Sequence, residues 1–132
     1  MPRQAVHTHR APANASYSQA VIAGNLVFVS GTMGRYMATG LWPATVEEQA
    51  EEALKNLAAV LAEAGCSLDD VVKTTVFLTD TMDGARIAEI YARAFPAPPP
   101  ARSAPVVSGF PIEEALISID AIAVRSEPGA NS

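Results

Sequence analysis

The sequence predicts a single α+β domain in which two helices pack on one face of one β-sheet. A length of 132 residues suits one domain, and a hydrophobic content of 49% is enough for a packed core. Strand-like and helix-like runs follow one another in the order β-β-α-β-α-β-β. We therefore interpret residues 1–132 as one domain, with an extended polar arm at 1–16 and a disordered tail at 126–132.

The first two strands are predicted at 17–23 and 26–33. Both runs are rich in β-forming residues, and the Gly24-Asn25 link between them suits a hairpin turn. Glycines at 31, 34 and 40 then indicate a loop that runs to Pro43.

The first helix is predicted from its capping residues and its periodicity. Thr45 followed by Glu48 matches a capping box, and Gly65 suits the position just after the helix. Glu47, Glu51 and Lys55 fall on the solvent side. The expected buried face consists of Val46, Ala50, Ala53, Leu54, Leu57, Val60, Leu61 and Ala64.

The second half of the chain is predicted to contain a strand, a helix and two further strands. A β-branched run predicts a strand at 71–78, and a helix is expected at 83–95, where the proline-rich stretch 96–100 stops it. The last strands are expected at 102–107 and 115–124. The expected buried residues of the second helix are Ile87, Ile90, Tyr91, Ala94 and Phe95.

The predicted strands are apolar on both faces. In the last strand Ile117 and Ile119 alternate with Leu116, Ile122 and Val124. Two helices can cover only one face of such a sheet, so the other face requires a partner, which we expect to be another copy of the chain.

The composition excludes several classes of function. A net charge of -5 and scattered Lys and Arg residues argue against nucleic-acid binding. One cysteine allows no intrachain disulfide, and no apolar run resembles a signal peptide or a membrane span. We expect a soluble, cytoplasmic protein with no membrane association.

Metal chemistry is not expected. His7 and His9 lie in the arm, far in sequence from Cys66, and their spacing matches no common zinc pattern. Cys66 follows a helix C-terminus, where the dipole raises the pKa of a thiol, so we interpret it as a packing residue.

Arg102 is the strongest candidate for binding a ligand. It follows the rigid Pro98-Pro99-Pro100 segment and begins a strand of otherwise small or apolar residues. A guanidinium held in this way can present its planar edge to a carboxylate. From the residues alone, a surface salt bridge is an equally good interpretation.

Several pieces of the sequence together resemble the RidA/YjgF family of reactive-intermediate deaminases. They occur in family order between about 17 and 125, with near-constant spacing. They are Tyr17, Val29-Ser30-Gly31, Val71-Val72-Lys73-Thr74-Thr75-Val76-Phe77, Pro100-Ala101-Arg102-Ser103 and Ile119-Asp120-Ala121-Ile122-Ala123-Val124.

The resemblance implies a chorismate-mutase-like fold assembled as a homotrimer, with a barrel-like arrangement of sheets and sites between subunits. It also implies hydrolysis of enamines or imines to 2-oxo acids and ammonia, without a cofactor. It assigns Arg102 to the substrate carboxylate. The remaining substrate-binding positions that it implies are Tyr17, Ser30, Gly31, Ser103 and Ala104.

Three positions depart from the family pattern. The acidic residue that orders water in deaminases is Ser118 here, and Asp120 lies on the same strand face about 6.6 Å further along. A family cysteine is Ala104, and Gly84 stands where the family has an aromatic residue, which widens the cleft. We expect Ser118, with water or Glu114, to serve in place of the acid.

Three functions stay open at this stage. The first is an imine or enamine deaminase. The second is a pathway-specific enzyme that tautomerises, cyclises or deaminates a larger carboxylate substrate, which Gly84 and Ser118 favour. The third is a non-catalytic protein that binds a small carboxylate-bearing metabolite.

Overall fold

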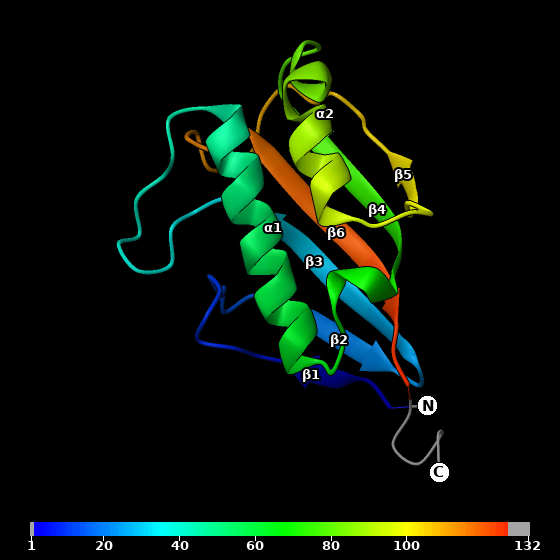
Figure 1. The fold of residues 1–132 in the computed structure, drawn as a ribbon. Helices are drawn as coiled ribbons and strands as arrows, with labels where there is room; N and C mark the ends of the chain where they lie inside the picture. Colours follow the sequence, from blue (N-terminus) through cyan, green and yellow to red (C-terminus); the bar gives the residue numbers. More distant parts are fainter. Residues whose placement is uncertain (1, 127–132) are drawn as a thin grey trace.

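The computed structural model describes residues 2–126 and contains one sheet covered on one face by two helices (Figure 1). The sheet has six strands in the order β1-β2-β3-β6-β4-β5. All neighbouring strands are antiparallel except β4 and β5, which are parallel. The predicted fold class, two helices on one sheet in a mixed α+β domain, is confirmed.

The bounds of the elements agree closely with the predicted ones in the middle of the chain. The strands are β1 Gln4–Val6, β2 Ala20–Ala23, β3 Leu26–Met33, β4 Val71–Leu78, β5 Ala101–Ser103 and β6 Ile117–Val124. The helices are α1 Val46–Glu63 and α2 Asp83–Ala94, with a short 3-10 helix at Leu68–Asp70. No helix among residues 2–126 has the length and apolar character needed to cross a membrane.

The arm at 1–16 contains a strand that the sequence pattern does not reveal. Residues Gln4–Val6 pair antiparallel with β2 and extend the sheet at that edge. Three residues are too few to show an alternating pattern, so the sequence gives no signal for this strand. In the structure its Val6 side chain is buried. Apart from Ser126, the predicted tail at 126–132 lies outside the described residues.

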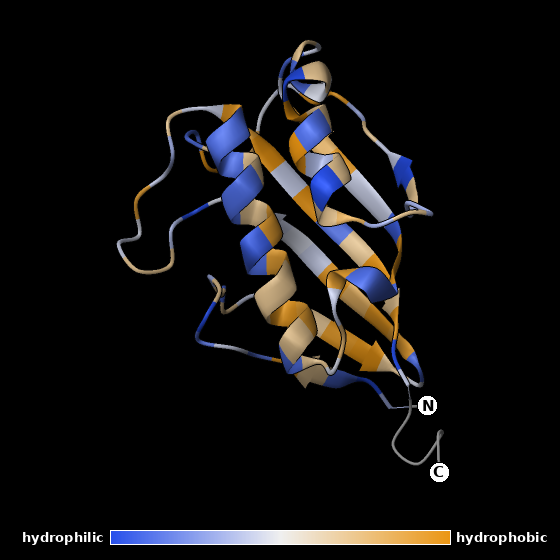
Figure 2. Ribbon diagram, viewed as in Figure 1, coloured by the Kyte–Doolittle hydropathy of each residue, from blue (hydrophilic) through white to orange (hydrophobic). Residues whose placement is uncertain are grey.

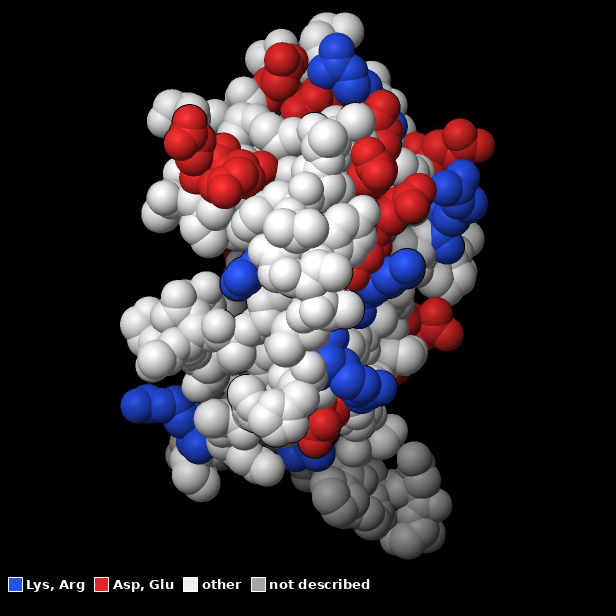
Figure 3. Space-filling view, turned by 90° about the vertical axis from the view of Figure 1, so that its left-hand side faces the viewer, with Lys and Arg blue, Asp and Glu red and all other residues white. Residues whose placement is uncertain are grey.

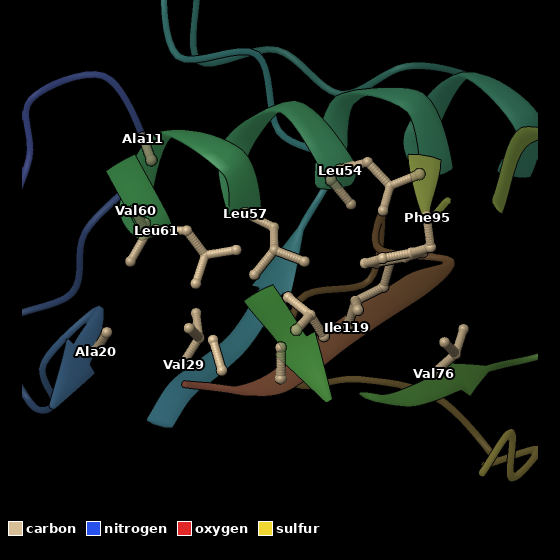
Figure 4. Close-up of a cluster of buried hydrophobic side chains, with 14 of the residues drawn as sticks. Ala11, Ala20, Val29, Leu54, Leu57, Val60, Leu61, Val76, Phe95 and Ile119 are labelled. Atoms are coloured by element: carbon tan, nitrogen blue, oxygen red, sulfur yellow. The ribbon is translucent and has the colours of Figure 1, made fainter. Parts of the chain in front are cut away.

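Helix α1 has the predicted ends and the predicted buried face. The Thr45 side chain accepts a hydrogen bond from the Glu48 backbone N–H, and Gly65 has a φ of +83° just past the helix. Leu57 and Leu61 point from the helix onto the sheet, where they meet Val29 and its neighbours (Figure 4). This layer of side chains is the core of the domain.

The two faces of the sheet are both apolar, as the strand pattern predicts. Figure 2 shows hydrophobic residues concentrated on the strands that lie behind the helices. On β6, Ile117 and Ile119 are buried under the helices, whereas Val124 is exposed on the opposite face. Leu26 and Phe28 of β3 are exposed on the same outer face.

Three predicted strands are longer than the observed ones. The strand expected at 17–23 begins at Ala20, and the one expected at 115–124 begins at Ile117. The strand expected at 102–107 is the three-residue β5, which ends at Ser103. Pro105 has no N–H to donate, so the regular ladder stops there. Contact with β4 resumes only as an isolated bridge between Leu78 and Val106.

Cys66 is buried, in agreement with a packing role. Burial raises the pKa of its thiol, and the nearby Asp70 carboxylate raises it further. The direction is the one expected from the sequence, but removal from water, rather than the helix dipole, is the largest cause.

Candidate small-molecule site

The candidate site residues fall into two groups on strands that lie three positions apart in the sheet. Arg102 and Ser103 lie on β5 at one edge, and Ser30 and Gly31 lie on β3. Strands β6 and β4 separate β3 from β5, which is roughly 14 Å at the usual spacing between strands. One chain therefore does not bring the two groups into a single site.

Arg102 is supported by an aromatic ring of α2. Its register partner on β4 is Thr74, so the arginine points to the helix-covered side of the sheet. Its guanidinium carbon lies 4.9 Å from the centre of the Tyr91 ring. The Tyr91 hydroxyl is in turn hydrogen-bonded to the Thr74 hydroxyl at 2.7 Å.

The edge of the Arg102 guanidinium is available to a ligand. The side chain forms no ion pair within residues 2–126, so the alternative of a surface salt bridge is not realised in this part of the chain. A guanidinium that contacts a ring and has no carboxylate partner keeps N–H groups that a ligand carboxylate can accept from. Arg102, Ser103 and Ala104 are all exposed in the single chain.

The second group lines an open cavity of about 130 Å³. The cavity lies between the arm at 11–19, the end of β3 and the loop that leads to α1. Tyr17, Ser30 and Gly31 contribute to its wall, and Tyr17 is 55% exposed. The Ser30 hydroxyl donates to the Ser18 carbonyl at 2.7 Å, which ties β3 to the arm.

A buried glutamine holds the arm in place. Gln19 accepts a hydrogen bond from the Thr8 N–H at 2.7 Å and donates to the carbonyls of Thr8, Ala11 and Pro12. One buried side chain thereby satisfies four backbone groups that would otherwise lack partners. The arm segment that faces the cavity is fixed by this network.

Two buried amides of α1 hold the other walls. Asn56 donates to the carbonyls of Met33 and Arg35 at 2.9 and 3.1 Å. Gln49 donates to the carbonyls of Pro43 and Glu114 at 3.0 and 2.8 Å. The Gln49 carbonyl oxygen also accepts from the N–H at position 116 at 2.8 Å. Both loops near the cavity are therefore fastened to the same helix.

Sequence reasoning missed these amides because they are polar residues on an apolar helix face. Gln49 and Asn56 share the helical spacing of Ala53 and Val60, and that periodicity is the signal that could have revealed them. Gly34 belongs to the same region. A Cβ atom at Gly34 would overlap the backbone carbonyl of Gln49, so the chain approaches α1 there more closely than a side chain allows.

The structure brings Ser118 next to Gly31. Ser118 is buried on β6, and a Cβ atom at Gly31 would lie 2.7 Å from its hydroxyl oxygen. Glu114 is exposed in the preceding loop. Gly84, at the start of α2, has the Leu78 side chain 4.0 Å from its Cβ position, so space is left where a larger residue would fit.

An arginine without an ion-pair partner within residues 2–126, together with an open cavity of mixed polar and apolar lining, is the kind of feature expected in a domain that binds small molecules. This mixed α+β chain belongs to the RidA (YjgF) family. The family model, described as Endoribonuclease L-PSP, matches residues 8–125.

Individual relatives are similar over nearly all of the chain. Reactive Intermediate Deaminase A of Arabidopsis thaliana is 45% identical over 123 residues, which cover 92% of this chain and 65% of the plant protein. The 2-iminobutanoate/2-iminopropanoate deaminase of Rattus norvegicus is 43% identical over 125 residues, covering 93% and 90%.

A solved relative shows the same fold. The crystal structure of TdcF from E. coli with bound serine superposes with a TM-score of 0.84 at 39% identity, covering 93% of this chain and 99% of that one.

Proposed function

We propose that the protein is a cofactor-independent deaminase that hydrolyses a carboxylate-bearing imine or enamine to a 2-oxo acid and ammonia. The observation that carries this proposal is the Arg102 guanidinium, which lies 4.9 Å from the centre of the Tyr91 ring and forms no ion pair within residues 2–126. The printed names of the plant and rat relatives, reactive intermediate and imine deaminases, support the same reaction class. Serine bound to TdcF supports a site for a small amino-acid-like ligand.

The reaction needs positioning more than strong acid–base catalysis. With the carboxylate on Arg102, water adds its oxygen to the imine carbon and the imine nitrogen gains a proton, which gives a carbinolamine. A further proton on that nitrogen allows ammonia to leave as the hydroxyl loses its proton and becomes the 2-oxo group. An enamine first takes a proton on carbon to become the imine.

Ser118 supports the orientation of the water in this scheme. A serine hydroxyl accepts a hydrogen bond from water but does not hold a proton at neutral pH as a carboxylate does. Its position beside Gly31 places it at the cavity group of residues rather than at β5. We propose that solvent or the exposed Glu114 carries the proton away.

The proposal includes a homotrimer with a site between subunits. Arg102 of one chain would meet Tyr17, Ser30 and Gly31 of another, since within one chain strands β6 and β4 lie between β3 and β5. The apolar outer face, which includes Phe28, supports packing of sheets against one another.

Space beside Gly84 favours the second candidate function, a pathway enzyme acting on a larger carboxylate substrate.

The test compares the wild type with Arg102→Ala using 2-aminoacrylate generated in situ. Loss of a bidentate charged contact is expected to lower kcat/KM for ammonia release by about 30-fold to 100-fold. Arg93→Ala, an exposed arginine of α2, is the matched control and is expected to retain the wild-type rate. Equal rates for Arg102→Ala and the wild type would remove the proposed function.

A further inference from the structure

The cavity next to Tyr17 extends beyond the residues that the proposed reaction uses. Its wall also contains Arg35, Trp42 and Ile112. Arg35 and Trp42 belong to the loop between β3 and α1, which projects from the left side of the molecule in Figure 1. Seen from that side, acidic groups gather at the upper end, while the middle is largely uncharged with isolated basic groups (Figure 3).

Arg35 lines both this cavity and the adjoining hollow that Gly40 lines, and hydrogen bonds define its position between them. Its backbone carbonyl accepts a hydrogen bond from Asn56 at 3.1 Å, and its side-chain Nε donates to the Gly40 carbonyl at 2.9 Å. A Cβ atom at Gly40 would lie 2.9 Å from a terminal nitrogen of this guanidinium, so glycine leaves it room. Both the backbone and the side chain of Arg35 are thus oriented by neighbouring groups.

The terminal nitrogens of Arg35 have no acidic partner in the described part of the chain. Arg35 takes part in none of the ion pairs of residues 2–126. A guanidinium with free N–H groups at the wall of a cavity favours an anionic ligand, and a carboxylate matches its fork.

The remaining wall suits a side chain of moderate bulk. Trp42 is partly buried, and Tyr17 and Ile112 add exposed apolar surface. The cavity volume of about 130 Å³ is close to the roughly 150 Å³ that accommodates a benzene molecule in a protein core. A group of about five or six non-hydrogen atoms therefore fits, which is the size of a propionate side chain.

We propose that this cavity is a specificity subsite for an acid-terminated substrate side chain, which Arg35 binds against Trp42. The preferred substrate class is then the imine of an acidic amino acid of about the size of glutamate. The inference rests on the proposed function, in which Arg102 binds the carboxylate beside the imine. Arg35 would bind the side-chain carboxylate and so distinguish substrates by their side chains.

The first experiment reads binding without catalysis. Trp42 is the single tryptophan of the chain, so its fluorescence reports directly on the cavity. We expect glutarate to bind the wild type about 10-fold more tightly than pentanoate, which has the same chain length and one carboxylate fewer. Arg35→Gln is expected to abolish that difference, and the matched control Arg93→Gln to preserve it.

Two results would overturn the subsite. One is an unchanged glutarate affinity in Arg35→Gln, and the other is no change of Trp42 fluorescence with either ligand. The second result is also the one expected if a neighbouring chain fills the cavity in the assembly.

The second experiment reads specificity during turnover. Imines of glutamate and leucine are produced in situ by amino-acid oxidases, and 2-oxo acid formation is followed. Arg35→Gln is expected to lower kcat/KM about 10-fold for the glutamate-derived imine and less than twofold for the leucine-derived imine. Arg102→Gln is expected to lower both, because both substrates carry the carboxylate beside the imine.

The outcomes separate the two proposals. Equal losses on both imines in Arg35→Gln would contradict the subsite and leave the proposed function standing. If the wild type turns over neither imine, the proposed function fails, and the fluorescence titration still decides whether Arg35 and Trp42 form an anion subsite.

Discussion

The two halves of the candidate site are built in different ways. The cavity beside Tyr17 is surrounded by segments that three buried amides fasten to the body of the protein: Gln19, Gln49 and Asn56. Arg102 instead lies on a three-residue strand at the edge of the sheet, and its whole strand is exposed. The cavity is therefore preformed within one chain, whereas the arginine is displayed on a surface.

This difference indicates which half of the candidate site, the cavity or Arg102, depends on another subunit. Backbone groups around the cavity find their partners inside the chain, so its geometry requires no other subunit. An exposed arginine stacked on one ring is oriented but not enclosed, and enclosure is what excludes water from a catalytic site. We expect substitutions of the buried amides around the cavity to act mainly on folding, and substitutions at β5 to act on function.

The largest expected effect is on folding, at the close approach of the β3–α1 loop to α1. Gly34→Ala would push a methyl group into the Gln49 backbone carbonyl, which cannot rotate away. We expect a loss of about 3 kcal/mol in the free energy of unfolding, measured by urea denaturation. Gly109→Ala is the control, because no atom lies within 4 Å of its Cβ position. Similar losses for the two variants would show that the loop is not clamped.

The next effect concerns the amide that joins the two loops. Gln49→Leu keeps the bulk of the side chain but removes three hydrogen bonds, to Pro43, Glu114 and the N–H at position 116. We expect a loss of about 2 kcal/mol and faster hydrogen exchange at that N–H. Glu51→Leu on the exposed side of α1 is expected to change stability by less than about 0.5 kcal/mol. If both variants were equally stable, the loops would not depend on Gln49.

The smallest expected effect on stability is at the other half of the site. Arg102→Ala removes an exposed cation–π contact with Tyr91, which contributes less than about 1 kcal/mol. Urea denaturation is expected to give nearly the wild-type value, and Trp42 fluorescence without ligand is expected to be unchanged. A loss above about 2 kcal/mol would mean that Arg102 has a structural role, and the contrast between the halves would disappear.

The sequence indicates candidate site residues and, through the resemblance, a site between subunits, but it does not show how far apart those residues lie within one chain. Resemblance to the family pointed to Arg102, Tyr17 and Ser118 by their position in ordered motifs. Their separation across the sheet follows from strand order, which no local pattern encodes. Arg35 and Trp42 were missed because a loop has no periodicity to mark residues that face a cavity.

The sequence by itself determined the elements whose signals are local. Capping at Thr45, the helical spacing of α1, the β2–β3 hairpin and the β-branched run of β4 depend on neighbours a few residues away. Only the tertiary structure decided that Gln4–Val6 joins the sheet, that β5 runs parallel to β4, and that amides of α1 hold distant loops. These features depend on hydrogen bonds between segments far apart in sequence, which form only once the chain has packed.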